Sequence, residues 1–119
     1  MQSREDALKA RGYSLDDVPK PNDIFAAAVE AAELCAANLL RVFARDIGRL
    51  SRIRRVIKVN GYVNRDPDFA DAHRVIHGAS RLLLDVLGQA GRHARAALGM
   101  AGLPLGASVE VEMIVAVEE

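Results

Sequence analysis

An arginine and a glutamate in the C-terminal part of the chain are the residues best suited to chemistry. Arg95 lies at the start of an expected strand at 94–101, and Glu110 lies early in a second strand at 109–117. A guanidinium offers a planar fork of N–H donors that matches a carboxylate, and a glutamate can accept a proton or position a water. If the strands are antiparallel neighbours joined through a turn at Leu103–Gly106, both side chains can meet at one ligand. The alternative is a structural ion pair between the strands.

The histidines and the single cysteine indicate less. His73 and His77 are four residues apart, so on a helix they project from one face, as paired metal ligands do. His73 lacks the adjacent glutamate of zinc proteases and no third ligand is evident, so we expect no metal site. His77 is expected at the surface or partly buried. Cys35 sits in an apolar stretch without a neighbouring base, which favours packing over catalysis. Ser80 lacks the context of a nucleophile elbow.

Two stretches show the composition and spacing of helices. From about Phe25 to Ile47 the chain is rich in Ala and Leu, and apolar residues recur every three or four positions. Met1–Pro21 precedes this helix as a lead-in interrupted by glycine and proline. A second helix is expected to begin after a cap at Asp66 or Asp68 and to run to about Leu87.

Three stretches read as strands: Ile53–Val63, then 94–101, then 109–117. In the first strand, one face is expected to carry Ile57, Val59, Gly61 and Val63, and the other Val56, Lys58, Asn60 and Tyr62. The order helix, strand, helix, strand, strand predicts an α+β fold in which two helices cover one face of a small sheet. Because the other face of the sheet is left uncovered, we expect self-association.

The composition sets the broad class. The chain has 119 residues, half of them hydrophobic, which suits one compact domain with a real core. Its 16 basic and 16 acidic residues cancel, so bulk attraction to nucleic acid is not expected, and the basic run Arg49–Lys58 fits a solvated surface. Charged residues interrupt the apolar stretch Ile24–Ala44, which argues against a membrane span. One cysteine and no signal-peptide pattern favour the cytoplasm.

Several short motifs resemble, in the right order, those of the RidA/YjgF family. They are VIKVNGYVN at 56–64, DPDF at 66–69, VIHGAS at 75–80, GRHARA at 91–96, LPLG at 103–106 and VEVE at 109–112. The family branch that they resemble carries VKVNGxVNxxPDF, VINGAS, GRHARS and a closing LPxxxxVEVEAI strand. The resemblance covers the chain from about Ala31 to Val117.

The resemblance implies a chorismate-mutase-like α+β fold, with 1–119 as a single domain, assembled as a homotrimer with ligand sites between subunits. Active members hydrolyse reactive enamines or imines to 2-keto acids and ammonia, and no metal or organic cofactor is implied. By motif, Arg95 holds the substrate carboxylate and Glu110 positions the water. His77 and Phe25 fall at substrate-binding positions. The implied partner is therefore a small imine or keto acid that carries a carboxylate.

The chain also differs from the family pattern. Strands that the family places before the first helix have no counterpart, so 1–28 is an atypical, shortened region. Phe25–Val29 is then either the start of the helix or a remnant strand. Phe25 replaces a tyrosine and loses its hydroxyl, and His77 replaces an asparagine, so the charge at this position depends on pH. Ala96 replaces a serine that often follows the arginine.

Two other functions are compatible with the resemblance. The first is a non-catalytic protein that binds small carboxylates or a partner in a shortened cleft. The second is RNA cleavage, an activity associated with some family members. The balanced charge and the 4% aromatic content make RNA cleavage the least favoured of the three.

Overall fold

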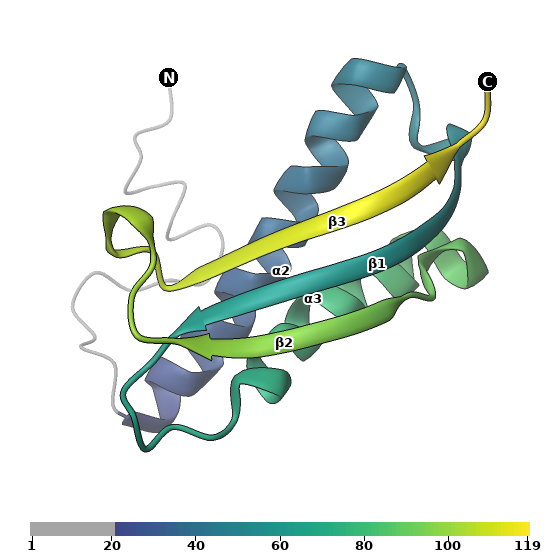
Figure 1. The fold of residues 1–119 in the computed structure, drawn as a ribbon. Helices are drawn as coiled ribbons and strands as arrows, with labels where there is room; N and C mark the ends of the chain where they lie inside the picture. The colour runs from purple at the N-terminus through teal and green to yellow at the C-terminus, as the bar shows by residue number, and fades with distance from the viewer. Residues whose placement is uncertain (1–20) are drawn as a thin grey trace, which may run out of the picture.

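The fold consists of two layers, a small sheet and a pair of helices that cover one of its faces (Figure 1). The computed structural model describes residues 21–119, so the lead-in expected at Met1–Pro21 lies outside the described residues except for Pro21, which begins a helix. The helices are α2 (Pro21–Ile47) and α3 (Ala72–Leu87), and the strands are β1 (Ile53–Asn64), β2 (Ala94–Met100) and β3 (Val109–Val117). Short 3-10 helices occupy the connections: η1 (Leu50–Arg52), η2 (Gly88–Gly91) and η3 (Pro104–Gly106). The expected α+β arrangement is confirmed.

The central strand of the sheet is β1, with β2 on one side and β3 on the other. Strands β1 and β2 are parallel, because α3 carries the chain back along the sheet between them, and β3 is antiparallel to β1. Helix α3 packs on β1 and β2, whereas α2 packs on β3 and on α3. The expected antiparallel pairing of β2 with β3 is therefore wrong. Because β3 lies beside β1 and not beside β2, the apolar face of β3 lies beneath α2.

Helix α2 is continuous from its first residue to Ile47, so a remnant strand at Phe25–Val29 is wrong. Ala32, Ala36 and Leu40, four residues apart, form its buried stripe. Gly48 has a φ of +91° and donates its N–H to the Ala44 carbonyl at 3.0 Å. A left-handed glycine after the last turn ends the helix at the expected position.

Helix α3 begins at Ala72, later than the expected caps Asp66 and Asp68. The Arg65 guanidinium donates to the carbonyls of Asp66 and Pro67, at 3.1 and 2.7 Å. The Asp66 carbonyl also accepts the N–H of Phe69 at 3.1 Å, so the segment between β1 and α3 forms a turn that the Arg65 side chain braces.

A bulge in β1 changes which residues face the helices. The register of β1 against β3 shifts between Val56 and Lys58. As a result Val56 is fully buried and Ile57 is 46% exposed, the reverse of the faces expected from strict alternation. Beyond the bulge the expected alternation holds, with Val59 and Val63 buried.

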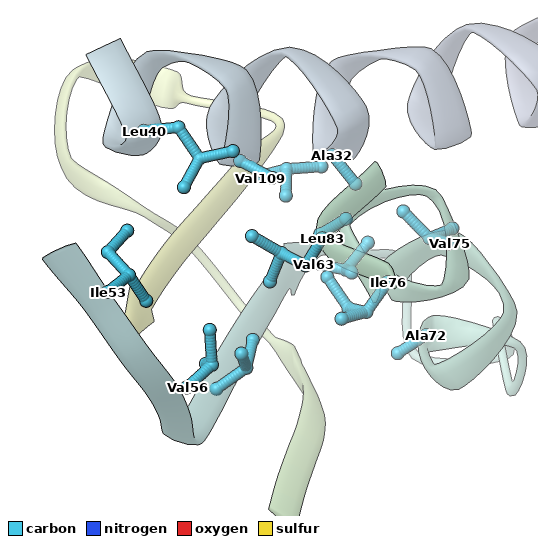
Figure 2. Close-up of a cluster of buried hydrophobic side chains, with 13 residues drawn as sticks. Ala32, Leu40, Ile53, Val56, Val63, Ala72, Val75, Ile76, Leu83 and Val109 are labelled. Carbon is cyan, nitrogen blue, oxygen red and sulfur yellow. The ribbon is translucent and has the colours of Figure 1, made fainter. Parts of the chain in front are cut away.

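The core lies between the two helices and the sheet and is almost entirely aliphatic (Figure 2). Its largest fully buried side chains are Ile76, Leu83, Val56, Val59 and Val75. The two helices approach closely at Gly78 of α3, where a Cβ atom would overlap the backbone carbonyl oxygen of Val29. Helix α3 is therefore held tightly against both α2 and β1, and it presents its remaining face as a fixed surface.

The face of the sheet that points away from the helices is uncovered in the described chain. It exposes the apolar side chains of Leu98 (51%), Met100 (36%) and Ile114 (59%). On the same face one oxygen of Glu112 accepts hydrogen bonds from Tyr62 Oη at 2.7 Å and Asn60 Nδ2 at 3.0 Å. The hydrogen bond between Tyr62 and Glu112 is the main cause of two pKa shifts. It lowers the pKa of Glu112 and raises the pKa of Tyr62.

Candidate functional site

Arg95 lies on the helix-facing side of β2 and reaches α3. Its register partner on β1 is the fully buried Val59, so both side chains point toward the helices. The guanidinium donates from Nη1 to Ser80 Oγ at 3.2 Å and from Nη2 to the His73 carbonyl at 3.4 Å. Because β2 is an edge strand, Arg95 is only partly buried. A guanidinium has about five N–H donors, so those not used here are available to an anion.

Ser80 also contacts His93, which lies just before β2. Ser80 Oγ is 2.8 Å from His93 Nε2, and His93 Nδ1 is 2.6 Å from the carbonyl oxygen of Gly91. From the sequence we assign no role to Ser80 or His93. The available signals are their places in the VIHGAS and GRHARA motifs, and the helical spacing that places Ser80 on the same face as His77.

A shallow cavity of about 440 Å³ brings together two of the predicted site residues. Phe25 from α2 and His77 from α3 both line it, together with Arg74, Arg81 and Glu30. The Arg74 guanidinium stacks over the Phe25 ring, 5.4 Å from its centroid. Neither arginine is indicated by the sequence motifs. They flank His77 by three and four residues, so helical spacing alone is the signal that could have found them.

The pKa of His77 is lowered from its ordinary value. Partial desolvation is the main cause, and the charge of Arg95 is the next, followed by His73, Arg81 and Arg74. His77 therefore favours the neutral imidazole, which can both donate and accept a hydrogen bond. The charge of Arg95 thus acts on His77, although Arg95 is not among the residues that line the cavity.

We expect Arg95→Gln to raise the pKa of His77, because the substitution removes a cation that opposes protonation of the imidazole. The measurement is an NMR titration of the histidine ring protons. Arg54→Gln, at an exposed position near the start of β1, is the control and should leave the titration unchanged. An unaltered His77 pKa in Arg95→Gln would contradict the proximity of the two groups. Because the folded-state pKa is lowered, protonation of this residue destabilises the fold as pH falls below the ordinary histidine range.

Glu110 does not meet Arg95 within one chain. Strand β1 lies between their strands, and Glu110 is the register partner of Tyr62, whose side chain is on the uncovered face of the sheet. Arg95 is on the opposite face. Burial and, to a lesser extent, the charge of Glu110 raise the pKa of the Cys35 thiol in α2. Cys35 is therefore held as a protonated thiol, as expected for a packing residue.

The chemistry that these residues support is the binding of an anion. Arg95, Arg74 and Arg81 supply positive charge around His77, and Phe25 supplies an apolar wall. Within 21–119, no three His, Cys, Asp or Glu side chains gather as metal ligands, and the rings of His73 and His77 lie edge to face with centroids 6.2 Å apart. No helix in the described part of the chain is both long enough and apolar enough to cross a membrane.

Residues 22–117 match the sequence profile of a family described as YjgF/chorismate mutase-like, putative endoribonuclease. The chain belongs to this family. The expectation drawn from the motifs is thereby confirmed, and the two helices on a small mixed sheet agree with a chorismate-mutase-like YjgF fold. Family membership alone does not distinguish the reaction.

Individual relatives are similar over most of this chain. Protein TCP17 of Trypanosoma cruzi is 45% identical over 86 residues, which cover 71% of this chain and 54% of that protein. The crystal structure of Atu1372, a protein of unknown function from Agrobacterium tumefaciens, is 54% identical with a TM-score of 0.75, covering 86% of this chain and 62% of that one. A structure from Shewanella oneidensis MR-1, described as a putative endoribonuclease, is 25% identical with a TM-score of 0.73, covering 86% and 64%. The chain spans less than two thirds of the length of each relative.

Proposed function

We propose that this YjgF-family chain hydrolyses small enamines or imines that carry a carboxylate, releasing 2-keto acids and ammonia. The observation that carries the proposal is the placement of Arg95, a partly exposed guanidinium bonded to Ser80 and to the His73 carbonyl, beside His77. The motif resemblance assigns the substrate carboxylate to Arg95, and its remaining N–H donors are free to bind it. The free thiol of Cys35 fits a reducing compartment, and we infer the cytoplasm.

The proposed reaction needs one water and a carrier for protons. Water adds to the carbon of the C=N bond, the nitrogen takes up a proton, and the resulting carbinolamine collapses to the keto acid and ammonia. His77, favoured as the neutral imidazole, can pass protons between the water and the nitrogen. Phe25 would contact the apolar part of the substrate from the opposite wall of the cavity. Glu110 can position the water only from a neighbouring copy of the chain.

We infer that the copies assemble as a homotrimer through the uncovered face of the sheet. This face exposes Leu98, Met100 and Ile114, and both β2 and β3 have an open edge in the described chain. Assembly would bury these side chains and would allow Glu110 of one copy to approach Arg95 of another. The ligand site would then lie between subunits.

Ile114→Asp is expected to convert the assembly to monomers, because it would place a charge inside an apolar interface. In the isolated chain the new carboxylate is tolerated, since Lys58 is the register partner of Ile114 on β1. Size-exclusion chromatography with light scattering gives the mass. Val86→Asp, at an α3 position that is 51% exposed, is the matched control and should keep the wild-type mass. A monomeric wild type, or an Ile114→Asp protein of wild-type mass, contradicts the proposed interface.

A keto acid with a second carboxylate should bind more tightly than a monocarboxylate of similar length. Arg74 and Arg81 line the cavity beside His77, and an additional charged contact corresponds to roughly tenfold in affinity. Calorimetry with 2-oxoglutarate and 2-oxopentanoate measures the difference. Arg81→Gln should reduce the preference and leave the affinity for 2-oxopentanoate nearly unchanged. Equal affinities in the wild type would argue against this placement of the ligand.

The direct test of the reaction is the release of ammonia and keto acid from 2-iminobutanoate or 2-iminopropanoate that is generated in the assay. Acceleration over spontaneous hydrolysis supports the proposal. A thermal shift with 2-oxobutanoate, but no acceleration, would identify a non-catalytic carboxylate-binding protein. The absence of both effects overturns the proposal.

A second candidate, RNA cleavage, is favoured by the endoribonuclease description of the family and of the Shewanella relative. The exposed Arg49, Arg54, Arg55 and Lys58 at the start of β1 would supply phosphate contacts. It ranks below both imine hydrolysis and non-catalytic carboxylate binding because the charges of the whole chain balance. RNA degradation that survives Arg95→Ala and increases at low salt would place it first.

A further inference from the structure

Arg95 stands at the end of a chain of hydrogen bonds that begins at the backbone. The Gly91 carbonyl bonds to His93 Nδ1 at 2.6 Å, His93 Nε2 to Ser80 Oγ at 2.8 Å, and Ser80 Oγ to Arg95 Nη1 at 3.2 Å. Gly91 ends η2, and His93 lies in the segment that follows it. Ser80 belongs to α3, and Arg95 belongs to β2. The guanidinium is thus connected through two side chains to a main-chain carbonyl.

The chemistry of the groups fixes the direction of these bonds. A carbonyl oxygen only accepts, so His93 Nδ1 carries the hydrogen that it donates to Gly91. In a neutral imidazole the other nitrogen then has a lone pair, so Ser80 donates its hydroxyl hydrogen to Nε2. The lone pairs of Ser80 Oγ are left to accept from Arg95, which has only donors. In this arrangement, the donor of each of the three hydrogen bonds faces an acceptor.

The backbone end of this hydrogen-bond chain, at Gly91, is held rigidly. Gly91 is buried, and a Cβ atom at this position would overlap the backbone carbonyl oxygen of Leu83 in α3. The end of η2 therefore rests directly on the backbone of α3, and Ser80 belongs to the same helix. The separation between the Gly91 carbonyl and Ser80 is set by one packed unit, with His93 bridging it.

We propose that Ser80 and His93 are positioning residues for Arg95, which they hold in the orientation that binds a carboxylate. The proposal rests on the function proposed for Arg95. A long arginine side chain otherwise loses considerable rotamer freedom when it binds a ligand, and prior anchoring removes part of that loss. Ser80 acts directly on the guanidinium, and His93 acts through the orientation of the Ser80 hydroxyl.

The Ser80–His93 contact also resembles an activated serine nucleophile, but two features favour positioning. Arg95 Nη1 lies 3.2 Å from Ser80 Oγ and takes up one of its lone pairs. His93 Nδ1 bonds to a neutral carbonyl, whereas the histidine of a catalytic triad bonds to a carboxylate that stabilises the imidazolium. A fluorophosphonate probe should therefore leave Ser80 unlabelled, and labelling of Ser80 would overturn the positioning role.

The hydrogen-bond chain can be tested on the full chain without any ligand. Nitrogen-15 NMR of the imidazoles should show His93 as the Nδ1–H tautomer with a hydrogen bond to Nε2. Ser80→Ala should shift the Nε2 resonance, Ser80→Thr should restore it, and Ser51→Ala, at an exposed serine of η1, should not change it. An Nε2–H tautomer in the wild type, or a spectrum indifferent to Ser80→Ala, overturns the proposal.

Ligand binding gives the second readout, with 2-oxobutanoate as the probe. Ser80→Ala should weaken its affinity by about tenfold, and Ser80→Thr should recover most of it. His93→Gln should weaken binding in the wild type but have no further effect once Ser80 is alanine, because His93 acts only through the hydroxyl. Additive losses would overturn this order of action. If wild-type protein binds no keto acid, the proposed function fails, and the imidazole spectra still decide the hydrogen-bond chain.

Discussion

Replacing Arg95 with alanine is expected to lower kcat/KM for imine hydrolysis by about a hundredfold. A bidentate guanidinium–carboxylate contact contains two charge-assisted hydrogen bonds of about 1.5 kcal/mol each, and their joint loss of about 3 kcal/mol corresponds to that factor. Since the carboxylate takes no part in the bonds that form and break, the loss should fall more on KM than on kcat. Initial rates of ammonia release over a range of substrate concentrations separate the two.

Two variants make the Arg95 experiment specific. Arg95→Lys keeps the charge but loses the planar fork, so only part of the activity should return. Arg92→Ala removes an exposed arginine shortly before β2 and should retain wild-type kinetics. Because Arg95 is partly exposed, all three proteins should melt near the wild-type temperature. Wild-type kcat/KM in Arg95→Ala would remove this residue from the reaction.

The parts of the site that could be predicted from sequence are those that depend on local order. Arg95 and His77 are both site candidates from the motif resemblance, and the apolar period indicates the helix that carries His77. Arg74 and Arg81 lie on that same helix, yet their meeting with Phe25 depends on where α2 crosses α3. That crossing is a tertiary contact with no signal in the spacing of either helix alone.

Strand order is the feature that sequence patterns predicted wrongly. The short connection between β2 and β3 favours a hairpin, and the expected meeting of Arg95 with Glu110 depended on it. The competing requirement is that α2 needs an apolar surface beneath it, which β3 supplies only from the far side of β1. The order is thus decided by the burial of a helix that lies before all three strands in the chain. The same order places β1 between the strands that carry Arg95 and Glu110.

The bulge in β1 shows a second limit of pattern reading. An alternating strand predicts Ile57 inside and Val56 outside, and both residues are apolar, so composition offers no correction. The register against β3 shifts between Val56 and Lys58, which inverts the faces of Val56 and Ile57, and a second shift between Ile53 and Arg55 returns Ile53 to the buried face. The buried faces of Val59 and Val63 are correct because they lie on the C-terminal side of the bulge.

Gly78→Ala is expected to destabilise the protein by about 2–3 kcal/mol. Alanine favours a helix over glycine by about 1 kcal/mol, which alone would stabilise α3. The added Cβ, however, meets the backbone carbonyl oxygen of Val29, and a backbone atom cannot turn aside as a flexible side chain can. Helices α2 and α3 must separate, which loosens the core around Val75 and Ile76 at a cost that exceeds the gain in propensity. Thermal melts at equal protein concentration should show a drop of roughly 10 °C.

Gly102→Ala is the matched control, because a Cβ at this position in the β2–β3 connection meets nothing within 4 Å. Its stability should stay within about 0.5 kcal/mol of the wild type. Since α3 carries Ser80 and His77, separation of the helices should also weaken keto-acid binding by Gly78→Ala below its melting temperature, while Gly102→Ala binds normally. Wild-type stability in Gly78→Ala would mean that α2 and α3 are not in backbone contact. The cavity between Phe25 and His77, which depends on that contact, would then lose its basis as a ligand site.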